Sequence, residues 1–173
     1  RLMIPIHEKL GRICGFTARK LSITPEWGEK NQNSALTWCL GSQYWANQPH
    51  RIGYNAKYGI LLDMVGAEGA VFNKEGTSMA YAPTVVKRLW ESAERLGYGD
   101  YFKRDVTPET IDDNLFVSEF AGIPSANIVH YQVQVLPMGY GPFHHTHADN
   151  LSIISTATLE AVGNTVLDVV WND

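Results

Sequence analysis

The fold of this chain is decided by the stretch Gly59-Ile60-Leu61-Leu62-Asp63-Met64-Val65, a short apolar run that contains one carboxylate. A continuous apolar run of this length, bounded by glycines, is typical of a strand buried on both faces of a parallel or mixed sheet. A carboxylate near the end of such a strand is costly to bury unless it is hydrogen-bonded, paired or bound to a metal ion. Asp63 is therefore a candidate ligand at the carboxyl end of a sheet, with hydrogen bonding to loop amides as the structural alternative.

The periodicity of the following sequence predicts a layered architecture. Apolar residues recur at helical spacing over residues 82–96, with Pro83 in the first turn and Gly97 at the C-terminal cap. Residues 123–131 indicate a second inner strand, and residues 155–171 indicate a helix behind a Ser/Thr cap. The apolar stripe expected on that last helix is Leu159, Val162, Val166, Leu167 and Val170. Strands alternating with helices predict an α/β fold of three layers, α/β/α, with a mixed, mainly parallel sheet.

Length and composition narrow the class of protein. A chain of 173 residues with 45% hydrophobic residues predicts one domain with a real core. The net charge of −4 and the scattered lysines and arginines argue against a nucleic-acid surface and favour small molecules or peptides as partners. No apolar run approaches the roughly 18 residues of a membrane span. Cys14 and Cys39 are too few for a disulfide framework and are expected to be buried free thiols.

A second informative stretch is His144-His145-Thr146-His147-Ala148-Asp149-Asn150, which follows a glycine-rich loop. Imidazole nitrogens and carboxylate oxygens are both ligands of zinc. A histidine shortly before a loop carboxylate is nevertheless common, and His144 and His147 are as readily explained by solvated side chains or a fortuitous transition-metal site. Residues 112–114, Asp-Asp-Asn, also offer adjacent carboxylates, which ordinarily form a helix cap or a solvated turn.

Taken together, the strand Leu61-Leu62-Asp63-Met64-Val65-Gly66 and the later His-Thr-x-x-Asp-Asn loop resemble the zinc aminopeptidase and glutaminyl cyclase superfamily. The resemblance implies that His145 is a zinc ligand. It implies that Asp63 ligates the second metal of two-zinc aminopeptidases, or serves as a hydrogen-bonding acid in one-zinc cyclases. Asp112 matches the first acid of an Asp-Asp-His sequence in the acidic network around the catalytic base, although Asn114 replaces the histidine.

The resemblance also has implications for the residues around the site, the cofactor, the substrate and the cellular location. Asp149 and Asn150 match the end of the histidine loop, where they would support a ligand or form a turn. His144 takes the place of a tryptophan that often forms the pocket wall in cyclases. One or two zinc ions, a peptide N-terminus or small peptide as substrate, and export to the periplasm or the outside are what the family implies. The oligomeric state is left open.

The resemblance covers residues 24–173, the C-terminal portion of a family domain, and it stops upstream of them. The family carries two adjacent acids, a general base and a zinc ligand, shortly before a Thr-Pro-Glu loop; here the loop is present at Thr24 but residues 18–21 read Ala-Arg-Lys-Leu. We therefore expect residues 1–23 to be an atypical segment produced by a frameshift or a wrongly joined gene end. The alternative to a partial aminopeptidase or cyclase is an inactive, truncated or frame-shifted remnant that binds metal weakly.

Overall fold

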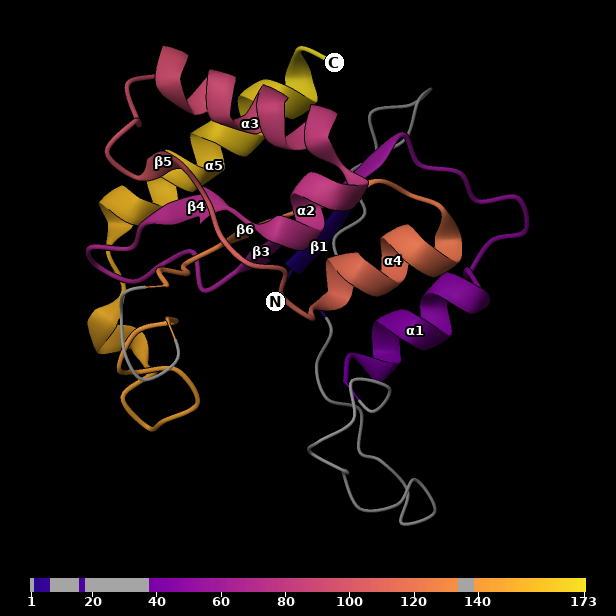
Figure 1. Ribbon diagram of the computed structural model, residues 1–173, viewed down its shortest axis with the longest axis horizontal. Helices are drawn as coiled ribbons and strands as arrows, with labels where there is room; N and C mark the ends of the chain where they lie inside the picture. The colour runs from indigo at the N-terminus through magenta and orange to yellow at the C-terminus, as the bar shows by residue number, and fades with distance from the viewer. Residues whose placement is uncertain (1, 7–15, 18–37, 134–138) are drawn as a thin grey trace.

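The computed structural model describes residues 2–6, 16–17, 38–133 and 139–173 of the chain. A mixed sheet lies in the middle layer and helices lie on both of its faces (Figure 1). The elements in chain order are β1 (Leu2–Ile6), β2 (Phe16–Thr17), α1 (Leu40–Asn47), β3 (Tyr58–Asp63), β4 (Phe72–Lys74), α2 (Gly76–Tyr81), α3 (Pro83–Arg95), β5 (Phe102–Val106), α4 (Asp113–Ala121), β6 (Ser125–Val129), a 3-10 turn (Leu151–Ile153) and α5 (Thr156–Trp171). This is the three-layer α/β/α fold that the sequence predicts.

The sheet is built around the predicted inner strands β3 and β6. They pair in parallel, so that Asp63 lies opposite Val129 at their shared carboxyl edge. On the other side of β3, strand β1 pairs in the antiparallel sense and is followed by β2, which gives the order β2-β1-β3-β6. Strands β4 and β5 form a second parallel pair, which an isolated bridge between Phe72 and His130 connects to the end of β6. The strands therefore form the mixed sheet that the sequence predicts, and Asp63 lies at its carboxyl edge as expected.

The two faces of β6 contact different helices. Ala126 and Ile128 face a core that contains the buried sides of α3 and α5, whereas the intervening Asn127 donates a hydrogen bond to Asp112 at the start of α4. Side chains alternate between the faces of a strand, so α3 with α5 and α4 with α1 lie on opposite sides of the sheet (Figure 1). The main core consists of residues that are nearly inaccessible to solvent, among them Ile60, Phe72, Val86, Leu89, Ala93, Phe102, Ile128 and Val162.

Helix α3 forms where the sequence predicts it. Pro83 occupies its first turn, and its C-terminus closes with Gly97 in the left-handed region at φ 85°. The amide of Tyr98 bonds to the carbonyl of Ala93 and that of Gly97 to the carbonyl of Glu94, which is the Schellman pattern of hydrogen bonds. Glycine is needed there because a Cβ penalises positive φ.

The structure refines three expectations for the fold. Residues 112–114 are expected to form a helix cap or a solvated turn, and Asp112 is the N-cap of helix α4 (Asp113–Ala121). Helix α5 forms as expected, but Leu159 and Leu167 are 43% and 53% exposed, because its buried face includes the polar Thr158 and Thr165. Cys39 is a free thiol but only half-buried, and Cys14 lies outside the described residues. Among the helices that the structure describes, none has the length and apolar character needed to cross a membrane.

Candidate metal centre and acidic cluster

Asp63 is the last residue of β3 and is half-buried at the carboxyl edge of the sheet. The next residue, Met64, adopts the left-handed conformation at φ 55°. Such a conformation is uncommon for a residue with a side chain and often marks a constrained position near a functional site. The backbone thus turns sharply immediately after the carboxylate.

Asp112 and Asp113 lie at the start of α4 and are 5% and 4% exposed. One carboxylate oxygen of Asp112 accepts the backbone amide of Asp113 at 2.8 Å, and the other accepts the side-chain amide of Asn127 at 3.1 Å. Asp113 accepts the hydroxyl of Ser42 from α1 at 2.6 Å. The helix N-terminus favours negative charge, and these hydrogen bonds fix the orientation of both carboxylates.

Glu75 is a fully buried carboxylate that sequence reasoning missed, and it caps the N-terminus of α2. Its Oε1 accepts the amides of Thr77 and Thr110 at 2.7 and 2.8 Å, and its Oε2 accepts the amide and the hydroxyl of Ser78 at 2.7 Å each. The neighbouring Gly76 makes this possible, because a Cβ there would lie 2.6 Å from the backbone nitrogen of Glu109. The close approach of two loops therefore supplies one of the four donors.

The hydroxyl of Ser78 connects Glu75 to the acids of α4. It accepts the backbone amide of Asn127 at 2.8 Å and the side-chain amide of Asn114 at 3.3 Å. Asn114 stands where the family pattern has a histidine. Its side chain is fully buried and donates to Ser78, so it is part of this network. A continuous polar network thus joins the start of α2, strand β6 and the start of α4.

Tyr140 lies beside this network and is a second residue that the sequence did not reveal. Burial, the hydroxyl of Tyr131 and the carboxylates of Asp112, Asp63 and Glu75 raise the pKa of Tyr140 to about 12. Negative charge near a phenol disfavours the phenolate, so the hydroxyl keeps its proton at neutral pH. The carboxylates of Asp63, Glu75 and Asp112 therefore all disfavour ionisation of this one tyrosine.

The histidine loop stacks on Tyr140. The ring of His144 lies 4.6 Å from that of Tyr140, and the ring of His145 lies 3.7 Å from that of His144, centroid to centroid. Tyr131 extends the row on the other side, at 4.6 Å from Tyr140. His145 itself is exposed and has φ 59°, which places the candidate zinc ligand at a constrained turn. The stack connects the two candidate histidines to Tyr140, and contact within ligand range between Asp63 and His145 stays a prediction.

The rest of the histidine loop is held by local hydrogen bonds. The hydroxyl of Thr146 donates to the carbonyl of Phe143 at 2.8 Å. Asn150 caps the following 3-10 turn by accepting the amide of Ser152, and its own amide donates to the carbonyl of His147. Asp149 is exposed, and its backbone amide bonds to the carbonyl of Thr146. Asn150 is therefore turn-forming, as expected; a supporting role for Asp149 stays a prediction.

His130 anchors the base of this loop. It is 7% exposed, its Nδ1 accepts the backbone amide of Val71 at 2.9 Å, and its ring stacks on Phe143 with centroids 6.0 Å apart. Desolvation lowers the pKa of His130, because burial disfavours the imidazolium. A neutral imidazole at the end of β6 thus supports Phe143, two residues before His145.

The types of donor at this edge suit zinc, but the described residues provide only part of a site. A carboxylate from Asp63 and an imidazole from His145 are two ligands, whereas catalytic zinc sites have three from the protein. In the described part of the chain, the compact group of three donors is Cys39, Asp112 and Asp113, and neither Asp63 nor His145 belongs to it. The donor types therefore fit zinc, but the described residues supply an incomplete set of ligands.

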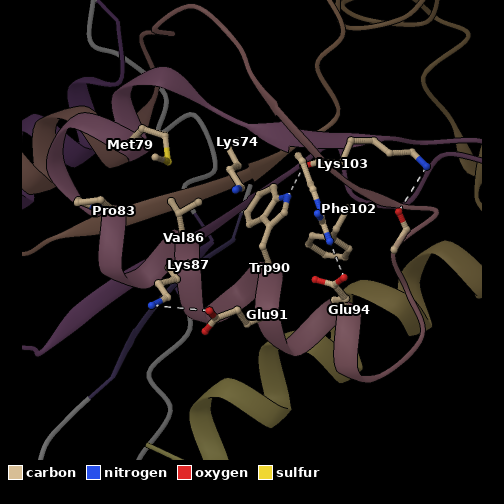
Figure 2. Close-up of a pocket in the computed structure, with 12 residues that line it drawn as sticks. Lys74, Met79, Pro83, Val86, Lys87, Trp90, Glu91, Glu94, Phe102 and Lys103 are labelled. Atoms are coloured by element: carbon tan, nitrogen blue, oxygen red, sulfur yellow. Dashed lines mark hydrogen bonds and ion pairs between the residues drawn. The ribbon is translucent and has the colours of Figure 1, made fainter.

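A separate hollow of about 520 Å³ lies between α3 and β5 (Figure 2). Trp90 and Phe102 meet edge to face beside it, and its charged residues include the ion pairs Lys87–Glu91 and Arg104–Glu94. None of the candidate site residues lines it. This hollow is thus unrelated to the candidate metal centre.

The residues that sequence reasoning missed share one property. Groups that interact with their polar atoms belong to other segments of the chain. Glu75 and Asn127 lie in stretches without any motif. Tyr140 had one available signal, since it stands between Gly139 and Gly141, both at positive φ. A Cβ at Gly139 would lie 2.5 Å from the ring of Tyr131, so this glycine is required for the aromatic row.

Comparison with known proteins gives a consistent family. The model for peptidase family M28 matches residues 26–170. A glutaminyl cyclase from Porphyromonas gingivalis is 43% identical, with 81% of this chain and 50% of that chain covered and a TM-score of 0.78. A leucine aminopeptidase precursor from Bacteroides thetaiotaomicron is 44% identical, with 87% and 49% covered and a TM-score of 0.76. A Zn-dependent exopeptidase from Parabacteroides distasonis is 38% identical, with 91% and 50% covered and a TM-score of 0.77.

The chain spans about half the length of these solved relatives. No curated protein matches it. The similarity thus links the chain to proteins described both as peptidases and as cyclases.

Proposed function

This chain belongs to peptidase family M28, and on that basis we propose that residues 24–173 are the C-terminal portion of a zinc-dependent domain that acts on peptide N-termini. Two activities fit, an aminopeptidase and a glutaminyl-peptide cyclase, since relatives of both descriptions match at similar identity. The zinc-dependent relative supports zinc as the cofactor of the family. The activity of the whole protein is part of this proposal.

One observation carries the proposal. The carboxylates of Asp63, Asp112 and Glu75 all act on the hydroxyl of Tyr140, and the rings of His144 and His145 stack onto that same tyrosine. Acids from three elements and two imidazoles of the histidine loop thus each act on or contact the same tyrosine, which supports a shared site. Sites built at the carboxyl ends of strands are where α/β proteins commonly bind their ligands.

The proposed roles follow from the chemistry of each group. His145 and Asp63 would hold zinc, which polarises the amide carbonyl that reacts. Asp112, with both oxygens fixed by hydrogen bonds, would orient the acid that carries the proton of the reaction. The protonated Tyr140 would offer a hydrogen-bond donor, and the ring of His144 would form the pocket wall in place of a tryptophan.

The second candidate is an inactive remnant, and it is favoured by a specific feature of the sequence. Residues 18–21 read Ala-Arg-Lys-Leu where the family delivers a general base and a zinc ligand. Either activity needs the missing glutamate to move a proton. Turnover by this chain would therefore require a substitute base.

Zinc calorimetry on the wild type and on His145→Ala tests the ligand assignment. We expect the site formed by Asp63 and His145 to bind zinc weakly and to lose it easily to a chelator, because two ligands are fewer than a catalytic site needs, and we expect His145→Ala to remove this weak binding. His147→Ala is the matched control, since it removes another exposed imidazole of the same loop. Equal loss in both variants, or none in His145→Ala, would contradict the assignment of His145.

Turnover of an aminoacyl-anilide and of an N-terminal glutaminyl peptide separates the two activities and the remnant. Hydrolysis of the anilide alone identifies an aminopeptidase, and cyclisation of the glutaminyl peptide alone identifies a cyclase. Absence of both in a folded, zinc-loaded chain supports the remnant.

We further propose that residues 1–23 result from a frameshift or a wrongly joined gene end. The family match begins at residue 26, and Arg19 and Lys20 stand where two acids are expected. Reading the upstream DNA in the other two frames should reveal an apolar strand that ends in two acids. Restoring that frame should restore zinc binding and turnover; if no frame encodes the acids, the frameshift is wrong and the inactive remnant is favoured.

A further inference from the structure

A group of side chains that could hold a metal ion lies where α1 packs beside α4 (Figure 1). Cys39 precedes α1, and Asp112 and Asp113 begin α4. One ligand atom from each of the three lies within 4.8 Å of the others, and the thiol sulfur is 4.0 Å from Oδ1 of Asp112. Cysteine and the acids come from segments 73 residues apart, so only the fold brings them together.

The spacing is close to what a single ion requires. Zinc lies about 2.3 Å from sulfur and about 2.0–2.2 Å from oxygen, so its tetrahedral ligands are separated by about 3.5 Å. Contraction of the present group by roughly 1 Å would reach that geometry.

Burial makes an ion at this place favourable. Both carboxylates are less than 6% exposed. Adjacent buried negative charges are costly unless cations or hydrogen bonds compensate them. A divalent ion would add to the compensation that the hydroxyl of Ser42, the side-chain amide of Asn127 and the start of α4 give these carboxylates.

An independent observation at the same place comes from Asn127. This side chain is 1% exposed, and its Nδ2 donates to Asp112, so the nitrogen end of its carboxamide faces the cluster. Its Oδ1 is buried and lacks a hydrogen-bond partner among the described residues. A buried amide oxygen without a partner calls for an explanation, and a bound ion or its water ligand would supply one.

We propose that Cys39, Asp112 and Asp113 form a binding site for a thiophilic divalent metal ion of the zinc type, with Asn127 at its inner wall. The thiol of Cys39 loses its proton to solvent as the metal–sulfur bond forms, and the carboxylates bind as anions. Sulfur selects zinc, cobalt or cadmium over magnesium and calcium, which prefer oxygen ligands alone. The group shares Asp112 with the acidic cluster near Tyr140, and its sulfur donor distinguishes it from the site assigned to Asp63 and His145, which contains no sulfur.

Cobalt(II) titration of the reduced chain tests this site directly. Cobalt bound by a thiolate has a sulfur-to-metal charge-transfer absorption in the near ultraviolet, which a site made of Asp63 and His145 cannot produce. We expect this absorption in the wild type and in Cys14→Ser, the matched control that removes the other cysteine, and its loss in Cys39→Ser. Absence of the absorption in the wild type, or its persistence in Cys39→Ser, would overturn the proposal.

A further variant tests the carboxylates, and a second measurement covers the case in which Cys39→Ser does not fold. Asp113→Asn should weaken cobalt binding by about 10-fold or more, since even residues that only support metal ligands contribute that much. His145→Ala should leave the charge-transfer absorption unchanged. If Cys39→Ser fails to fold, alkylation of the wild type is measured instead: cadmium should protect Cys39 from iodoacetamide in peptide mapping, and unprotected Cys39 at saturating cadmium would refute the site.

Discussion

Substitution of the buried Glu75 by glutamine is the sharpest test of the polar network. The carboxylate has two oxygens that each accept two donors. Glutamine has one oxygen, which we expect to face Thr77 and Thr110, so that its NH₂ faces Ser78. The Ser78 hydroxyl already accepts from Asn127 and Asn114, so it can accept from that NH₂ only by giving up one of these bonds, and the backbone amide of Ser78 is left without an acceptor.

The expected cost follows from these contacts. One buried amide without an acceptor costs about 1–3 kcal/mol, and each remaining bond loses roughly 1 kcal/mol when its acceptor is no longer charged. We therefore expect Glu75→Gln to lower the free energy of unfolding by about 3–5 kcal/mol.

Urea unfolding followed by far-ultraviolet circular dichroism at neutral pH measures this difference. Glu109→Gln is the matched control, because Glu109 is exposed and lies next to Thr110 in the same loop. We expect the control to change stability by less than about 0.5 kcal/mol. A cost for Glu75→Gln below about 1 kcal/mol, with an unchanged urea dependence, would refute the four-donor arrangement.

Three further predictions concern the core and the titrating groups. Leu89→Ala, at a fully buried position, should destabilise by about 2–5 kcal/mol, whereas Leu96→Ala, at 39% exposure, should cost below about 1 kcal/mol in the same urea assay. The lowered pKa of His130 means that the folded state binds fewer protons than the unfolded state, so wild-type stability should fall as pH drops below about 6.5. His130→Gln keeps an acceptor for Val71 without titrating, and an equal decline in this variant would contradict the assignment. Tyr140→Phe should remove a phenol ionisation near pH 12 from the ultraviolet titration, and loss of an ionisation near pH 10 instead would show that the acids do not face Tyr140.

The sequence alone determined the elements whose signal is local. Strand β3 and helix α3 follow from an apolar run and from helical periodicity with Pro83 and Gly97 at the ends. These patterns depend on neighbours within about two turns of helix or one strand, so they are readable without knowing the fold. The family was readable for a similar reason, because the motifs around Asp63 and His145 are contiguous.

The tertiary structure alone decided which polar groups are buried and what they meet. Glu75, Asn127 and Tyr140 carry no motif, and the partners that explain them come from other elements. Helix α5 shows the same limit: Thr165 lies on its buried face because its hydroxyl donates to the carbonyl of Ala161 in the preceding turn. Apolar periodicity places Leu167 on that face instead, yet it is 53% exposed. A polar side chain becomes a core residue once its hydrogen bonds are satisfied within the protein, and that condition is set by three-dimensional contacts between segments distant in the sequence.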